Sequence, residues 1–230
     1  MDSRTSILNS VKEALRDVDK SKTVEPEVPF IWEVKGLSSE ELAPIFAQNL
    51  QAVAGEAVLC DTRDDAVRQI ANVLGQIADA NDKTPPYRLA VYPSEIVRDV
   101  SSKLNLENWT LDSAPEDQAV DPKDYEKISA SLISPLALLS DTGSCVAEGR
   151  TAFERLLFYL SPACLVVARA SQLRENMPHA WSEIAAKLTP NQHGEIAIIT
   201  GPSRTADIEK KLVLGVHGPQ RLIVFIIKNE

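Results

Sequence analysis

Short apolar runs alternate with amphipathic helical stretches along most of this chain, and this alternation restricts its fold more than any other feature. The order strand, helix, strand, helix over residues 57–104 is typical of α/β folds with a largely parallel sheet. The last apolar run, residues 222–227, is continuously hydrophobic, which predicts a strand buried on both faces. We therefore expect an α/β fold, a three-layer α/β/α sandwich with a mostly parallel sheet.

The second half of the chain predicts the remaining elements of the domain. Residues 132–139 are apolar, Asp141-Thr142-Gly143 signals a turn, and residues 144–147 resume an extended run. This order predicts a hairpin-like or bulged pair of strands. We also expect a strand at 109–111, a central strand at 164–168, a buried strand at 195–199, a helix at 152–159, and a helical stretch from 171 toward 188 that is interrupted at Pro178.

The N-terminal segment is predicted to be a separate amphipathic helix. Apolar residues recur at helical spacing within residues 5–18, and residues 19–37 have the composition of an extended linker. We therefore divide the chain into a helix with its linker, residues 1–37, and an α/β domain, residues 38–230. The apolar face of the helix can pack on the domain or dock on another subunit, and the sequence does not choose between them.

The acidic balance of the chain excludes two classes of partner. The chain has 24 Lys and Arg against 33 Asp and Glu, a net charge of −9. This argues against a nucleic-acid binder and against an anionic-membrane binder, since both need a basic surface. Residues 1–140 hold 24 of the acids and 14 of the bases, whereas residues 141–230 hold 9 acids and 10 bases. The nearly neutral second region also holds every candidate site residue.

The sequence lacks the common nucleotide and cluster motifs. It has no G-x-G-x-x-G, no G-x-x-x-x-G-K-[ST] and no C-x-x-C. Cys60, Cys145 and Cys164 lie in apolar stretches, so we expect buried thiols and no cofactor or metal in this chain. No apolar run approaches the roughly 18–20 residues that span a bilayer, and the N-terminus has no signal-peptide core. We therefore expect a cytoplasmic protein with no transmembrane segment.

The segment 199–209 indicates an anion-binding site. It leaves an apolar strand, turns through a Gly-Pro pair and is predicted to enter a helix, whose N-terminus would offer unpaired N–H groups. Ser203 and Thr205 add hydroxyl groups, and Arg204 adds a guanidinium fork that matches a carboxylate or phosphate. A helix cap at Ser203 or Thr205, with Arg204 paired to a surface acid, explains the same residues.

Two further residues are candidates for acid–base or nucleophilic chemistry. His217 lies between glycines just before the last strand, and its ordinary pKa suits a general acid or base. Glu148 closes an apolar run, where a carboxylate can act as a base or a nucleophile. The plainer alternatives are a hydrogen-bonded turn histidine and a glutamate paired with Arg150 or Arg155.

Three stretches together resemble a known family. The closing signature of the lactate utilization protein C family, whose members contain a LUD domain, is similar to residues 200–222, TGPSRTADIEKKLVLGVHGPQRL. The block before that signature resembles residues 140–149, SDTGSCVAEG, and residues 155–173, RLLFYLSPACLVVARASQL. The match is specific over about 135–230. Over residues 1–130 only the length and the helix-then-linker layout agree.

The resemblance implies a function and a set of site residues. Such proteins are cytoplasmic members of a three-protein set that oxidises L-lactate to pyruvate, and their partners carry iron–sulfur clusters. Their fold is similar to that of the sugar-phosphate isomerase and CoA-transferase superfamily. The positions that match the family pattern, which are our candidate catalytic and ligand-binding residues, are Asp141, Thr142, Gly143, Glu148, Gly201, Ser203, Arg204, Thr205, Asp207, Glu209, His217 and Gly218.

These observations leave more than one hypothesis for the function. The first is a subunit without a cluster that binds a small anionic ligand within a lactate-oxidising set. The second is a stand-alone enzyme of the CoA-transferase or isomerase type that acts on a small carboxylate or phosphate, with Glu148 as nucleophile or base. A third is a regulatory sensor of a small carboxylate. The sequence does not decide whether this chain catalyses a step itself.

Overall fold

The computed structural model describes residues 3–16, 32–80, 84–113, 125, 127–187, 194–206, 212–214 and 218–230. Contacts divide the chain into two units, residues 1–33 and residues 34–230. The first unit contains helix α1 (Ser3–Ala14), which has no buried residue. The predicted helix of residues 5–18 is therefore present at least as far as residue 14, and residues 17 and 18 lie outside the described residues.

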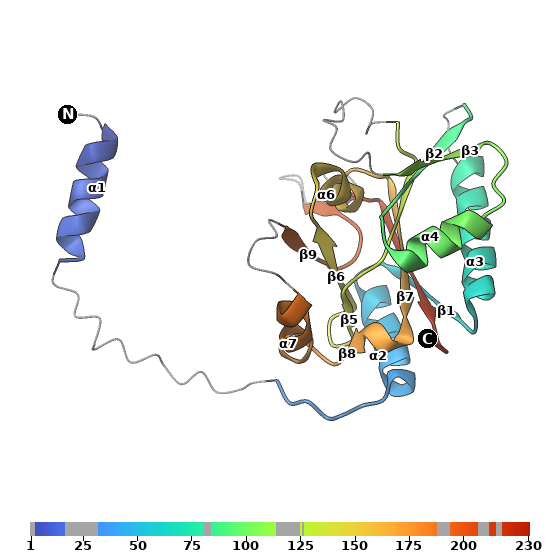
Figure 1. Ribbon diagram of the computed structural model, residues 1–230, viewed down its shortest axis with the longest axis horizontal. Helices are drawn as coiled ribbons and strands as arrows, with labels where there is room; N and C mark the ends of the chain where they lie inside the picture. The colour runs from blue at the N-terminus through green and yellow to red at the C-terminus, as the bar shows by residue number, and fades with distance from the viewer. Residues whose placement is uncertain are drawn as a thin grey trace. The chain divides into compact units, whose positions relative to one another are not determined.

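The second unit is built on one parallel six-stranded sheet (Figure 1). Its strand order is β1-β12-β7-β4-β2-β3, and every neighbouring pair is parallel. The predicted α/β class is confirmed, and so is the predicted strand near residue 109. The strands are β1 (Glu56–Cys60), β2 (Tyr87–Val91), β3 (Trp109–Ser113), β4 (Ala130–Ile133), β7 (Ala163–Arg169) and β12 (Arg221–Ile227).

Strand β12 lies in the interior of this sheet, as its continuous hydrophobicity predicts. Leu222, Val224 and Ile226 face one hydrophobic core, and Ile223 and Phe225 face the other. All five are fully buried. Burial on both faces explains why no polar residue interrupts this run.

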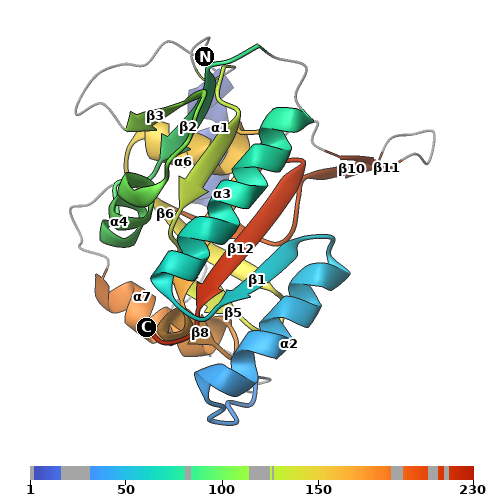
Figure 2. The same ribbon diagram turned by 90° about the vertical axis from the view of Figure 1, so that its right-hand side faces the viewer.

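Helices cover both faces of the parallel sheet and complete the three predicted layers. Helices α3 (Arg63–Asp79) and α4 (Glu95–Lys103) pack on one face, and Figure 2 shows α3 lying across it. Helices α2 (Ser39–Ala52) and α6 (Ala152–Tyr159) pack on the other. Each helix begins at a hydroxyl cap that accepts a backbone N–H, and these caps are Ser38, Thr62, Ser94 and Thr151.

A second, four-stranded sheet shares a layer with α2 and α6. Its order is β8-β5-β6-β9, and helix α7 (Met177–Lys187) covers its far side. The antiparallel pair of β5 and β6 confirms the predicted hairpin. The sequence did not predict that this hairpin leaves the main sheet to form another one. The strands are β5 (Ala137–Leu139), β6 (Ser144–Gly149), β8 (Leu173–Arg174) and β9 (Glu195–Ile199).

Three local predictions are corrected by this second sheet. The apolar run 132–139 is two strands, because Pro135 has no N–H to continue a ladder. Strand β9 is not buried but lies at the edge of the sheet, where Ile198 is 54% exposed. The helix expected after Ser171 begins at Met177, so Pro178 lies in its first turn, where a missing N–H costs little. Among the described residues no helix is long and apolar enough to cross a membrane.

Candidate functional site

The segment after β9 does not have the structure that its sequence suggests. Residues Arg204–Ala206 form strand β10, which pairs antiparallel with β11 (Leu212–Leu214) beyond the start of β12 (Figure 2). The helix predicted to begin after Ser203 is therefore wrong for these described residues. Pairing with the apolar 212–214 run overrides the helical pattern of residues 204–206, because strand preference depends strongly on cross-strand packing. A helix N-terminus does not contribute to anion binding at residue 204.

The structure nevertheless brings two of the candidate segments together. Strand β6 pairs antiparallel with β9, so the start of β6 lies beside the end of β9. The Ser144 hydroxyl lies 2.7 Å from the Thr200 hydroxyl and donates to the Thr142 hydroxyl at 2.8 Å. Thr142 in turn donates to the Asp141 carboxylate at 3.2 Å. We call these four residues, Asp141, Thr142, Ser144 and Thr200, the hydroxyl chain.

Two glycines hold the hydroxyl chain against the end of helix α2. Gly143 has φ +65°, and a Cβ there would lie 2.3 Å from the backbone nitrogen of Leu50. Gly201 has φ +77°, and its Cβ would lie 2.5 Å from the Val53 carbonyl oxygen. Both positions require glycine, because L side chains rarely adopt this φ and no space is left. The two turns are thereby fixed on one support, although 58 residues separate them.

A third candidate segment joins the same region through Ser203. Its backbone N–H donates to the Pro219 carbonyl at 2.9 Å, and a Cβ on Gly218 would lie 2.9 Å from the Ser203 Cβ. Arg204 follows directly and is exposed, so its guanidinium is open to a ligand from solvent. Hydrogen bonds thus connect three segments in order: residues 141–144 to residues 200–204, and these to residues 218–219. The candidates Asp207, Glu209 and His217 lie outside the described residues, and for Thr205 only the strand position is described.

Glu148 lies apart from this region, at the other end of β6. At about 3.3 Å per residue, the four-residue separation puts it roughly 13 Å from Ser144. Its side chain is 8% exposed and accepts two hydrogen bonds from Arg150, at 3.0 and 3.1 Å. The pairing with Arg150 that the sequence offered as the plainer alternative is therefore present. It raises the pKa of Arg150.

Tyr92 and Glu154 accompany Glu148, and the sequence did not single them out. Tyr92 directly follows β2, at the carboxyl end of that strand. Burial, together with the negative charges of Glu154 and Glu148, raises the pKa of its hydroxyl to about 12. Glu154 is buried and accepts the Arg150 N–H at 2.7 Å. Because Glu154 also donates its own backbone N–H to the Thr151 hydroxyl, it helps to fix the first turn of helix α6.

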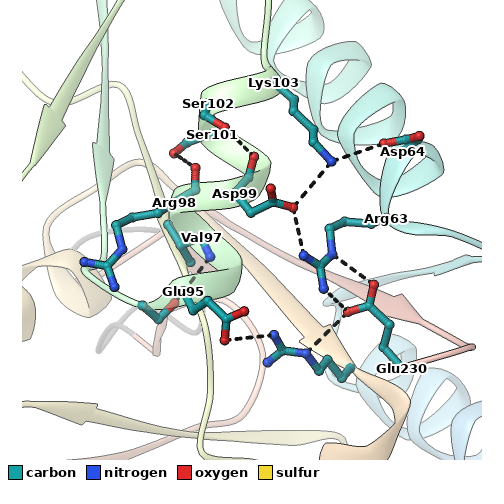
Figure 3. Close-up of polar contacts among 12 residues, drawn as sticks. Arg63, Asp64, Glu95, Val97, Arg98, Asp99, Ser101, Ser102, Lys103 and Glu230 are labelled. Atoms are coloured by element: carbon teal, nitrogen blue, oxygen red, sulfur yellow. Dashed lines mark hydrogen bonds and ion pairs between the residues drawn. The ribbon is translucent and has the colours of Figure 1, made fainter.

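A network of charged residues occupies the carboxyl ends of the parallel strands (Figure 3). Arg63 binds Glu230 at 2.6 Å and Asp99 at 2.9 Å, and Arg169 binds the same Glu230 at 3.3 Å. Arg63 lowers the pKa of both Glu230 and Asp99 through these hydrogen bonds. We call it the carboxyl-end network, and its members are Arg63, Asp64, Glu95, Asp99, Lys103, Arg169 and Glu230.

The sequence does not reveal this network, because its members come from four separate segments. Open α/β sheets often bind ligands at the carboxyl ends of their strands, so this edge is an alternative location for a site. Here, however, both arginines and Lys103 are already bound to carboxylates. The arrangement ties the ends of β7 and β12 to helices α3 and α4, which is a structural role.

The cysteines do not form a reactive or metal-binding site. Cys60, Cys145 and Cys164 are buried and free, as the sequence predicts. Burial raises the pKa of the Cys60 and Cys164 thiols to about 12 and also raises that of Cys145. These thiols are therefore protonated and unreactive near neutral pH. Within the part of the chain that the structure describes, no cluster of His, Cys, Asp and Glu can hold a metal ion.

The fold and these segments define an α/β protein whose glycine turns and hydroxyl residues gather beside the small second sheet. The LUD domain family model matches residues 43–227, and the chain therefore belongs to that family. Two relatives named lactate utilization protein C are similar along most of their length. The one from Bacillus pumilus is 25% identical over 205 residues, covering 86% of this chain and 84% of the relative. The one from Oceanobacillus iheyensis is 24% identical over 204 residues, covering 84% and 83%.

A solved structure supports the fold. The crystal structure of a DUF162 family protein from Deinococcus radiodurans has a TM-score of 0.52 and 16% identity, covering 83% of this chain and 99% of that one. At this identity the likeness concerns the fold alone. The resemblance that residues 140–149 and 200–222 carry is thus confirmed at the level of the family.

Proposed function

We propose that this protein acts in L-lactate utilization, as a subunit without a metal cluster that binds a small carboxylate. The names of its relatives support the role in lactate utilization. The observation that carries the ligand-binding part is the convergence of residues 141–144, 200–204 and 218–219 in one region. The exposed Arg204 provides the positive charge in that region for an anion.

The proposed subunit role includes partners. The resemblance to lactate utilization protein C implies partners that carry iron–sulfur clusters for the oxidation of lactate to pyruvate, and the lack of a C-x-x-C in this sequence is consistent with clusters on those partners. Affinity purification of the native full chain, with iron analysis of the proteins that copurify, tests this role. Copurified iron–sulfur proteins would support it. Oxidation of lactate by this chain alone with an artificial electron acceptor would contradict it.

Titration calorimetry with L-lactate and pyruvate tests the anion site. The wild-type chain should bind at least one of these acids, and Arg204→Ala should weaken binding by about 1.5–3 kcal/mol, the scale of a charged hydrogen bond. Because Arg204 is exposed, the variant should keep the wild-type stability. Unchanged affinity in a folded Arg204→Ala protein would remove this residue from the site.

The geometry around Glu148 favours the subunit role over the stand-alone enzyme. A transferase mechanism needs a carboxylate that is free to attack an acyl group. Both oxygens of Glu148 accept hydrogen bonds from Arg150, and the side chain is nearly buried. Trapping of an acyl intermediate on Glu148, absent in Glu148→Gln, would restore the enzyme hypothesis.

A further inference from the structure

The hydroxyl chain has a single direction, set by the number of hydrogens it contains. A serine or threonine hydroxyl donates one hydrogen bond and accepts others, whereas a carboxylate only accepts. The Thr142 hydroxyl donates its hydrogen to Asp141, and the Ser144 hydroxyl donates its hydrogen to Thr142. The remaining contact, 2.7 Å between Ser144 and Thr200, therefore needs the hydrogen of Thr200. All three hydroxyl hydrogens point toward Asp141.

This direction fixes what Thr200 can offer to a ligand. Ser144 is 2% exposed and lies between the exposed residues Thr142 and Thr200. The chain therefore ends at the exposed Thr200, whose hydrogen is engaged and whose oxygen can still accept a hydrogen bond. A lone pair accepts a hydrogen bond from a ligand hydroxyl and is unfavourable next to a ligand carbonyl oxygen.

We propose that Thr200 is a specificity-determining residue that favours a 2-hydroxy acid over the matching 2-keto acid. This inference rests on the proposed function, in which the ligand carboxylate binds beside Arg204. Thr200 directly follows β9 and is exposed, and Arg204, which begins β10 after the turn through Gly201 and Pro202, is exposed as well. The ligand's hydroxyl donates to Thr200, while its carboxylate accepts from the guanidinium. The selectivity originates at Asp141, which polarises the chain.

Calorimetry of the full chain with three acids of one size tests the residue. The probes are L-lactate, which has a hydroxyl, pyruvate, which has a carbonyl, and propionate, which has neither. Wild type should bind L-lactate about three- to tenfold more tightly than pyruvate, the range that one hydrogen bond gives. Thr200→Val should abolish this ratio by weakening lactate binding alone, and the matched control Thr200→Ser should keep it.

A second variant tests the direction of the chain without touching its outer end. In Thr142→Val, Ser144 loses its acceptor and becomes free to donate to Thr200, whose own hydrogen then becomes available to the ligand. The lactate-to-pyruvate ratio should fall to one or below, with pyruvate binding improved. A role of Thr142 in structure alone would weaken both ligands equally and would contradict the inference.

The outcomes separate this inference from the proposed function. If Arg204→Ala weakens all three acids alike while Thr200→Val leaves the ratio unchanged, the anion site stands and the role of Thr200 is wrong. If Arg204→Ala changes nothing, the proposed site fails while the ratio still reports on Thr200. A wild-type chain that binds none of the three acids contradicts both.

Discussion

The hydroxyl chain and the carboxyl-end network are both polar clusters assembled from distant segments, yet their chemistry differs. The network joins full charges, and its cations Arg63, Lys103 and Arg169 are bound to carboxylates. The hydroxyl chain is neutral along most of its length and ends at the exposed Thr200, four residues before the exposed Arg204. The more charged cluster is therefore the less suited to a ligand, because its binding capacity is used internally. A ligand site thus needs donors and acceptors that are not already paired within the protein, and charge alone does not mark one.

The largest expected effect concerns the support of the hydroxyl chain. Gly143→Ala should lower the free energy of unfolding by about 3 kcal/mol or more, because φ is +65° and the new Cβ would overlap the Leu50 backbone. The matched control is Gly75→Ala, inside helix α3 with open space around it, which should raise stability by up to about 1 kcal/mol. Urea denaturation measures both. Equal effects of the two substitutions would refute the role of α2 as a support.

The next largest effect concerns the contribution of the carboxyl-end network to stability. Arg63→Ala should lower the free energy of unfolding by about 2 kcal/mol, because Glu230 and Asp99 lose a shared partner while they are partly buried. Its control is Arg221→Ala, which breaks the more exposed pair with Glu56 and should cost under about 1 kcal/mol. If Arg63→Ala also weakened binding of lactate or pyruvate, the assignment of a structural role to the carboxyl-end network and of ligand binding to the region of the hydroxyl chain would be wrong.

A smaller effect appears in the pH dependence of stability. Glu230 and Asp99 have folded-state pKa values below their ordinary ones, so they bind fewer protons when folded. Their contribution is present above the unfolded pKa of about 4 and is lost as pH falls through the folded value. Between pH 5 and pH 2, roughly, Arg63→Ala should therefore lose less stability than wild type. Denaturation midpoints across this range give the comparison, and parallel curves would show that Arg63 does not shift these carboxyls.

Much of the fold follows from the sequence because burial leaves a pattern along the chain. The 222–227 run reports two buried faces, and Asp141-Thr142-Gly143 reports a turn through its residue types. The β10–β11 hairpin is not predicted by such reasoning, because the sequence of residues 204–211 has a helical pattern that masks the short strand pairing with residues 212–214. The second sheet escapes it as well, since a strand's pattern does not say which sheet it joins.

The sequence predicts some of the segments that the structure brings together at the candidate site, and particular residues show why it predicts only some. The segments around Thr142 and Ser203 were identified, and the structure brings them together through the pairing of β6 and β9. Glu148 lies close to Ser144 in sequence, but the extended strand between them separates the two residues by roughly 13 Å. The sequence does not single out Thr200, because its hydrogen bond is to Ser144, which is 56 residues away. The carboxyl-end network has no local signal at all.

The location of ligand binding is the central claim, and backbone amide NMR of the full chain titrated with L-lactate tests it most directly. The account predicts that the amide signals of Gly143, Thr200, Gly201 and Gly218 shift together with one affinity, while those of Arg63, Arg169 and Glu230 do not move. Shifts confined to the carboxyl-end network, or to Glu148 and its neighbours, would contradict it.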